Sequence, residues 1–152
     1  MRRLRATVAT GDSGQLILLI LVYTVIAGLL VTVVVNVSKV YLYRRSLVAA
    51  ADGAALSAAN QPDLSAVYNG AGSTLPLSRA GARAAVTQYV SDADLEARFV
   101  QFRVAGVDTD GITVTVTFRA TVRMPFGNLI SARYAAGYDV HATARARSPL
   151  TP

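Results

Sequence analysis

The chain has no cysteine and no tryptophan, and it has a single histidine, His141. Without cysteine it forms neither disulfides nor thiolate metal sites, so a folded domain must be stable through packing alone. One imidazole without cysteines gives no recognisable zinc set. No G-x-S-x-G, Walker-type or G-x-G-x-x-G segment occurs, so no nucleophile elbow or phosphate loop is indicated. These absences argue against an enzyme and against a bound cofactor or metal ion.

Charge is also missing from a long segment, because no Asp, Glu, Lys, Arg or His occurs between Asp12 and Lys39. The twenty residues from Leu16 to Val35 are almost all apolar. A helix of that length covers about 30 Å, the thickness of the hydrocarbon core of a bilayer. The sequence therefore predicts a single-pass anchor in the lipid bilayer of a cell membrane. Its polar side chains are those of Tyr23, Thr24 and Thr32.

The formal net charge of +6 lies mostly around this segment, since the first 45 residues hold five of the excess positive charges. Cations placed on both sides of an apolar helix are typical of contact with phospholipid headgroups. Residues 46–152 are nearly balanced, so the charge gives no support to nucleic-acid binding.

A secretory signal also begins with basic residues and an apolar run, but signal h-regions span only ~7–15 residues. The small residues that a signal peptidase needs, Ala49 to Ala51, follow Lys39, Arg44 and Arg45. We therefore expect a retained anchor. Cations flank it on both sides in nearly equal number, and a free amino terminus favours a cytoplasmic N-terminus, with the C-terminal domain outside the cytoplasm.

The helical pattern continues past the apolar run to Ala59, where Asn60-Gln61-Pro62 ends it. We predict one helix from about Gln15 to Ala59. Residues 61–77 are rich in turn formers and predict a surface loop. A second helix follows with Ser78 as N-cap, and its apolar positions have helical spacing. These positions are Ala82, Ala85, Val86, Tyr89 and Val90.

Strict alternation of apolar and polar residues predicts three strands in the C-terminal half. The strongest pattern runs from Gly111 to Met124, with Ile112, Val114, Val116, Phe118, Ala120, Val122 and Met124 on one face. A second strand has Val100, Phe102 and Val104 on one face, and a third has Tyr138, Val140, Ala142, Ala144 and Ala146. The segment from Asp108 to Gly111 predicts a hairpin turn. The expected fold is α+β, a long helix followed by one helix on a three-stranded antiparallel meander. The second helix, and the outer half of the first, would cover the apolar face.

Few polar residues suggest chemistry of their own. His141 falls on the polar side of the third strand, where we expect it to face solvent. The carboxylates Asp92, Asp94, Glu96, Asp108 and Asp110 lack the glycine and glutamate spacing of a helix-loop-helix calcium site, so turns and a helix exit explain them. Four arginines share the polar face of the sheet with threonines, and they form either a solvated face or a docking face for an anionic polymer or acidic partner. They are Arg103, Arg119, Arg123 and Arg145.

The segment from Asn36 to Ala59 resembles the N-terminal module of TadE/TadG-like proteins of the bacterial Flp (tight-adherence) pilus machinery. That family tends to show an apolar span followed by D-x-G-x-x-Y-x-x-R-x-x-L-Q-x-A-A-D-A-A-A-L. The matching residues here are Tyr41, Arg44, Leu47, Ala50, Ala51, Asp52, Ala54, Ala55 and Leu56. Asn36, Ser38, Val48 and Gly53 stand where the pattern has Asp, Gly, Gln and Ala. The resemblance covers about a third of the chain.

The resemblance implies a non-enzymatic, pilin-like minor subunit or assembly factor, with residues 1–13 cytoplasmic, 14–59 as anchor and helical extension, and 60–152 as a small extracytoplasmic domain. Expected partners are lipid and other pilin-like subunits or Tad assembly proteins in a hetero-oligomer, bound through Ala/Gly-rich faces such as Ala27-Gly28 and residues 50–59. Asp52 would bond to a neighbouring subunit or face water. Gly14-Gln15 is a candidate processing site, although the fifth position after the cut is Leu19 and not the glutamate of pilins. The alternative is a tethered envelope module that binds an anionic polymer or a partner protein through the basic sheet face. A tethered hydrolase has no nucleophile-base set in its favour.

Overall fold

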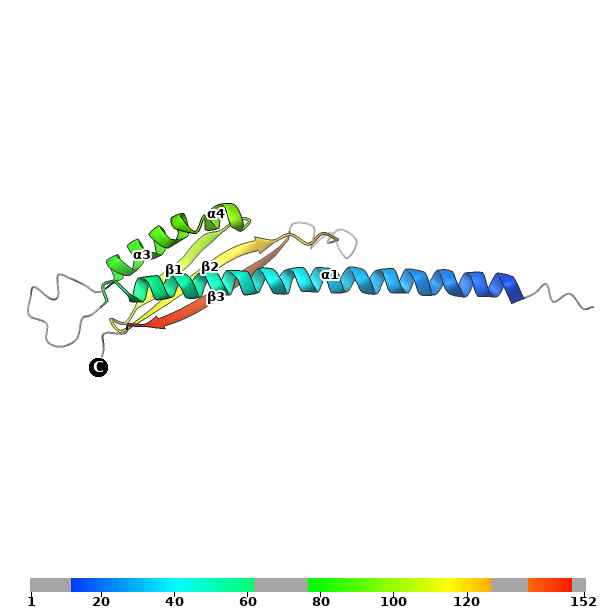
Figure 1. Ribbon diagram of the computed structural model, residues 1–152, viewed down its shortest axis with the longest axis horizontal. Coiled ribbons are helices and arrows are strands. Elements are labelled where there is room, and N and C mark those ends of the chain that lie inside the picture. The colour runs from blue at the N-terminus through cyan, green and yellow to red at the C-terminus, as the bar shows by residue number, and fades with distance from the viewer. Residues whose placement is uncertain (1–11, 62–76, 127–136, 149–152) are drawn as a thin grey trace, which may run out of the picture.

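The computed structural model describes residues 12–61, 77–126 and 137–148, and it has the α+β architecture expected from the sequence. A single long helix carries a small domain along its C-terminal part, as Figure 1 shows. The other elements are two shorter helices and one antiparallel sheet. The N-terminal part of the long helix extends beyond the domain and contacts none of the other helices or strands (Figure 1).

The long helix, α1, runs from Asp12 to Ala59 and confirms the predicted helix, with a start three residues earlier than expected. It contains no proline, and its residues beyond Val35 are rich in alanine, the strongest helix former. The helix ends at the expected residue, where Asn60 N–H donates to Leu56 O at 3.2 Å and Gln61 N–H donates to Ala58 O at 3.3 Å. One continuous helix thus belongs both to the apolar segment and to the domain.

The sheet consists of β1 (Arg103–Thr109), β2 (Thr113–Val122) and β3 (Tyr138–Arg147), paired antiparallel in that order. This arrangement confirms the predicted meander. The β1–β2 turn also lies where it was expected, because Asp110 Oδ1 accepts hydrogen bonds from the backbone N–H groups of Ile112 and Thr113. Gly111 has φ +91° in this turn, a conformation that L side chains rarely adopt.

The first strand corrects one part of the predicted pattern. It begins at Arg103, and a register shift between Val104 and Gly106 places Val107 opposite Val116 on the buried face. Of the three apolar residues predicted for one face of this strand, Phe102 is partly buried and packs against the core, as expected. Val100 precedes β1 and Val104 lies on this edge strand, and they are 37% and 41% exposed. Beyond Val104 the bulge changes the alternation, so the next buried residue of the strand is Val107. The apolar faces of the other strands are confirmed except at their ends, where Ile112 and Tyr138 are exposed and Met124 lies beyond β2.

The outer half of α1 is the main cover of the sheet, since it packs along β2 and β3 and also contacts the second helix. Its alanines face Val114, Val116 and Phe118, which are fully buried. Small side chains let a helix backbone approach a sheet closely. Helix α3 (Arg79–Asp92) packs against α1 and β1, and its N-cap is confirmed because Ser78 Oγ accepts a hydrogen bond from Gly81 N–H at 2.9 Å.

A chain of aromatic rings joins α1 to the start of the sheet, after the short helix α4 (Leu95–Arg98). The Tyr43 ring meets Phe99 edge-on at 5.2 Å between centroids, and Phe102 meets Phe118 at 5.0 Å. The Tyr43 hydroxyl oxygen also accepts a hydrogen bond from Val100 N–H at 2.9 Å. These contacts hold the α4–β1 connection against the middle of α1.

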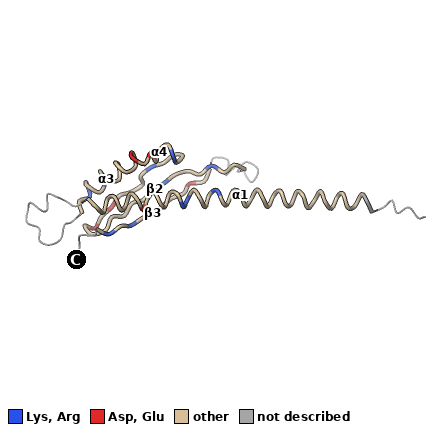
Figure 2. Tube along the Cα trace, in the orientation of Figure 1, with Lys and Arg blue, Asp and Glu red and all other residues tan. Residues whose placement is uncertain are grey.

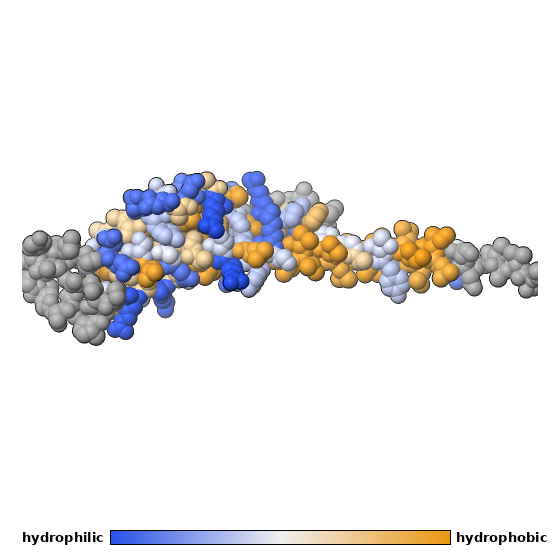
Figure 3. All heavy atoms as spheres, in the orientation of Figure 1, coloured by the Kyte–Doolittle hydropathy of each residue, from blue (hydrophilic) through white to orange (hydrophobic). Residues whose placement is uncertain are grey.

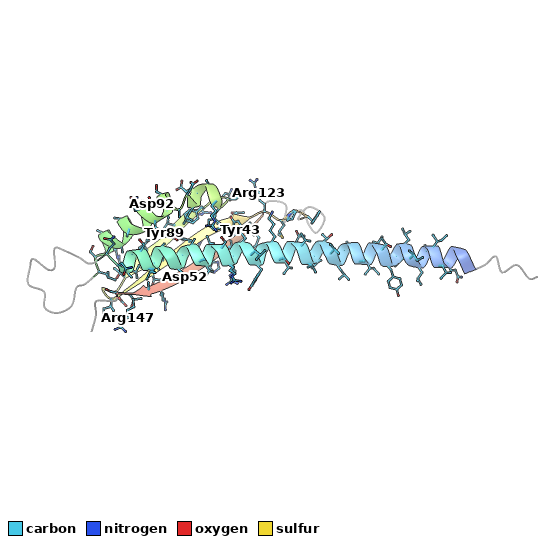
Figure 4. The ribbon with its side chains drawn as sticks, viewed as in Figure 1. Tyr43, Asp52, Tyr89, Asp92, Arg123 and Arg147 are labelled. Atoms are coloured by element: carbon cyan, nitrogen blue, oxygen red, sulfur yellow. The ribbon has the colours of Figure 1, made fainter. Side chains whose placement is uncertain are left out.

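Gly53, where the family pattern has alanine, lies directly under Tyr89 of α3, and Figure 4 labels Tyr89 beside this part of α1. A Cβ built on Gly53 would contact the Tyr89 hydroxyl and lie 2.7 Å from its ring Cζ. The glycine therefore makes room for the tyrosine between α1 and α3.

We predict that Gly53→Ala stabilises the domain only when the Tyr89 ring is removed. Alanine is favoured over glycine inside a helix by up to ~1 kcal/mol. In a Tyr89→Ala background, Gly53→Ala should raise the thermal midpoint of the detergent-solubilised chain. With Tyr89 present the ring must move, so the gain should be lost, which gives a coupling of about 1 kcal/mol. Equal effects in the two backgrounds would contradict this contact.

The hairpin turn makes a second prediction. The backbone N–H groups of Thr113 and Ile112 bond to Asp110 and hold the pKa of its carboxyl below the ordinary value of 3.8. A lowered native pKa stabilises the fold above the unfolded pKa, and this contribution is lost as the pH falls through the native value. Asp110→Asn keeps an acceptor oxygen but does not titrate. Its thermal midpoint should fall less in acid than that of the wild type.

A suitable control is Asp52→Asn, which removes an exposed carboxylate without a hydrogen bond among the described residues. That variant should keep the acid dependence of the wild type. If Asp110→Asn and the wild type lose stability in parallel, the carboxylate does not contribute to the turn in this way.

Candidate membrane anchor and assembly surfaces

The apolar part of α1 has no protein cover among the described residues. From Leu16 to Val35 the large apolar side chains are 41–69% exposed. By length and composition α1 is a helix that could cross a membrane, and the most apolar window is not buried at all by the rest of the described chain. Figure 3 shows orange side chains over this segment, and Figure 2 shows no charged residue there.

Its two threonine hydroxyls are satisfied within the helix. The Thr24 hydroxyl donates to Ile20 O and the Thr32 hydroxyl donates to Gly28 O, each at 2.8 Å. In hydrocarbon an unpaired hydroxyl would be costly, and these bonds remove that cost. An apolar helix of this length, uncovered among the described residues and with both threonine hydroxyls paired, fits a membrane anchor.

The domain begins where the apolar segment ends. Asn36, the first residue after Val35, is buried, and its Oδ1 accepts a hydrogen bond from Phe126 N–H at 3.4 Å. The chain beyond β2 therefore reaches α1 at the level of the last apolar turns, near Arg123, which Figure 4 labels at this end of the sheet. The exposed cations Lys39, Arg44 and Arg45 follow within the next three turns.

The family-motif residues divide into two sets. One set lies inside the protein, with Leu47, Ala50, Ala51, Ala54 and Ala55 each at most 6% exposed and in the main hydrophobic core. Ala58 and Ala59 are buried too. The small residues of the motif are therefore used by the chain's own helix–sheet interface, which leaves them unavailable to a neighbouring subunit. The other set, Tyr41, Arg44, Asp52 and Leu56, is exposed.

Five exposed residues of α1 lie on the side opposite the sheet, at alternating spacings of three and four. We call them the outer stripe: Leu42, Arg45, Ala49, Asp52 and Leu56. Such spacing keeps side chains on one seam of a helix. Neither Arg45 nor Asp52 forms an ion pair with another described residue. Asp52 thus faces outward, with no partner inside the described chain. Sequence reasoning missed this surface, although its heptad spacing is present in the sequence.

The four arginines of the predicted docking face are all exposed, and three of them lie on the outer side of the sheet. Arg103 pairs with Arg119, and Arg119 pairs with His141, so one row across the sheet holds two guanidinium groups and the imidazole. Arg145 pairs with Thr115 near the other end, and Arg123 follows the end of β2.

Carboxylates interrupt this face. Asp108 forms an ion pair with Arg79 at 3.3 Å between Nη2 and Oδ1, and both groups are well exposed. Asp139 Oδ1 lies 2.7 Å from the Thr121 hydroxyl, which is also 2.9 Å from Gln101 Oε1. Sequence reasoning did not bring these groups together. The face is mixed in charge, with its most basic row at Arg103 and Arg119.

The remaining site predictions concern metals and processing. Within the described ranges, no group of three or more His, Asp or Glu residues could hold a metal ion. Asp92, Asp94 and Asp110 lie at the end of α3, before α4 and in the β1–β2 turn. Gly14 and Gln15 are exposed in the first turn of α1, and a cut between them stays a prediction. The predicted basic N-terminus and the loop over residues 62–76 lie outside the described residues.

Comparison with known proteins gives one match. The family described as putative Flp pilus-assembly TadE/G-like matches residues 14–61, which confirms the resemblance seen in the sequence. The matched segment is almost the whole of α1. No curated protein and no solved structure matches the chain.

The division of the motif residues is open to a direct test. Leucine is nearly as good a helix former as alanine, so the two substitutions below differ mainly in packing. Ala54→Leu adds volume to a fully buried position and should lower the stability of the domain by about 1–3 kcal/mol. Ala49→Leu, on the exposed side, should change it by less than about 0.5 kcal/mol. Thermal unfolding in detergent, followed by circular dichroism, measures both. Equal losses would mean that the helix does not pack as described.

Proposed function

We propose that this protein is a membrane-anchored, non-enzymatic, pilin-like component of a Flp/Tad-type pilus assembly or secretion system. The family match supports a role in Flp pilus assembly. The observation that carries the finer proposal is that α1 has two roles. Its N-terminal half is apolar and exposed among the described residues, and its C-terminal half packs on one face of the small sheet. A subunit built this way can be held in lipid while its domain is presented at the surface.

The proposed topology has residues 1–13 in the cytoplasm, residues 14–59 as anchor and helical extension, and residues 60–152 outside the cytoplasm. The charge pattern supports a division of residues 14–59 into an anchor and an extension, because no charged residue occurs between Asp12 and Lys39 and exposed arginines follow at Arg44 and Arg45. Arginine and lysine side chains at such a boundary can extend to the headgroup layer.

Association with other subunits would use the outer stripe, since the alanines of the motif are occupied inside the domain. Leu42, Ala49 and Leu56 offer apolar surface along one seam, and Arg45 and Asp52 offer one charge of each sign. The proposed partners are other pilin-like subunits or Tad assembly proteins in a hetero-oligomer. Within the bilayer, the small pair Ala27-Gly28 would let a second helix approach closely, and Gly28 has open space around its Cα.

The experiment combines deletion of the gene with complementation. Deletion should abolish surface pili and adherence, and the wild-type gene should restore them. Leu56→Glu places a charge on the exposed outer stripe and should reduce piliation several-fold without unfolding the domain. Val104→Glu is the matched control, because Val104 is also exposed but lies on β1, away from the stripe. Piliation is counted by electron microscopy at equal protein levels.

Three outcomes would count against the proposal or against part of it. Unchanged piliation after deletion would contradict a role in pilus assembly. The better explanation would then be an envelope module tethered to the membrane. Binding of an anionic envelope polymer, lost in Arg103→Gln/Arg119→Gln, would establish that alternative, which rests on the row of arginines across the sheet. Equal effects of Leu56→Glu and Val104→Glu would leave the stripe without a role in assembly.

A further inference from the structure

An apolar groove of about 500 Å³ lies along α1 at the end of the membrane segment. Side chains from successive turns of α1 line the groove, together with Met124, which lies just beyond β2. The lining residues are Val33, Asn36, Val37, Val40, Tyr41, Arg44 and Met124. Eleven residues separate Val33 from Arg44, which corresponds to a length of about 16 Å along the helix.

The groove changes character along this length. At the end of the groove nearest the N-terminus, Val33 and Val37 are 51% and 63% exposed, and Val33 belongs to the apolar segment that fits the hydrocarbon core. At the other end of the groove, toward the C-terminus of α1, is Arg44, an exposed guanidinium without an ion pair among the described residues. A molecule that filled the groove would therefore need an apolar part at one end and an anionic part at the other.

A hydrogen-bond donor without a partner lies between Val33 and Val37, on the Asn36 side chain. The Asn36 side chain is only 3% exposed, and its Oδ1 is used by Phe126 N–H. Its Nδ2 is buried and has no hydrogen-bond acceptor in the structure as described. Buried polar groups are rarely left unpaired, so an acceptor supplied by a ligand would complete this one. Along α1 the groove thus presents Val33, the amide donor of Asn36, the apolar side chains of Val37 and Val40, and last the guanidinium of Arg44.

We propose that the groove binds one anionic phospholipid of the surrounding leaflet. An acyl chain lies against Val33, an ester oxygen accepts the Asn36 Nδ2–H, the glycerol region passes Val37 and Val40, and the phosphate pairs with Arg44. A phospholipid has apolar, acceptor and anionic parts along its length, and the bilayer supplies it at high concentration. Guanidinium suits the phosphate because it can donate two parallel hydrogen bonds. The inference rests on the proposed membrane anchor.

The test uses the full-length protein in nanodiscs that contain phosphatidylcholine with a minor share of phosphatidylglycerol. After gentle release into detergent, native mass spectrometry counts the lipids that remain bound. We expect one retained phosphatidylglycerol. Arg44→Gln should lower its retention about tenfold, because a charge-assisted pair is lost. Asn36→Leu should lower it several-fold. Arg45→Gln is the control, since Arg45 is the next residue but lies on the outer stripe and does not line the groove.

Three results would overturn the proposal: no retained lipid in the wild type, equal retention of phosphatidylcholine, or equal losses in Arg44→Gln and Arg45→Gln. The last would mean general attraction of cations to an anionic surface and not a site. An alkaline carbonate wash of cell membranes tests the anchor separately. Retention of the protein after the wash, together with loss of the lipid effect, would reject the groove and keep the anchor.

Discussion

One helix has to satisfy two environments, and the rest of the structure depends on this constraint. Its first half presents leucine, isoleucine and valine on all sides, and no other part of the described chain covers them, so it suits a medium as apolar as itself. Its second half is apolar on one side only, and that side is made of small residues that lie on a sheet. The change occurs within a turn of Asn36, where Phe126, in the segment after β2, donates a hydrogen bond to the helix.

The small residues of the family motif acquire a physical explanation from this arrangement. A helix can lie close to a sheet and a second helix only if its facing side chains are short. At position 53 even a methyl group would meet the Tyr89 ring, and this position is glycine. The buried alanines belong to one core with valines, leucines and phenylalanines, and this packing takes the place of disulfides in a chain without cysteine. They also leave the opposite side of the helix, with Arg45 and Asp52, as the surface open to other molecules.

Prediction from sequence succeeded where one periodicity holds over many residues. The helix to Ala59, the strand around Phe118 and the hairpin turn at Asp110 follow from local spacing and turn chemistry, and all are present. It was wrong about Val100 and Val104, which are exposed before and at the start of the edge strand β1. It also missed Val107, which the bulge after Val104 places on the buried face, because no local signal marks a bulge. Residues 50–59 were also expected from the sequence to contact other subunits. The apolar side of a helix has the same spacing whether it packs on another subunit or on a sheet of its own chain.

By itself the sequence determined the bare apolar segment, the order of helices and strands, and the resemblance to the pilus family, since these depend on composition and spacing along the chain. Only the tertiary structure decided which motif residues are buried, which side of α1 remains open, and that Asn36 meets Phe126 across ninety residues. Those facts depend on how a distant strand is placed against the helix. Packing of this kind is set by the fit of whole surfaces, which local periodicity does not specify.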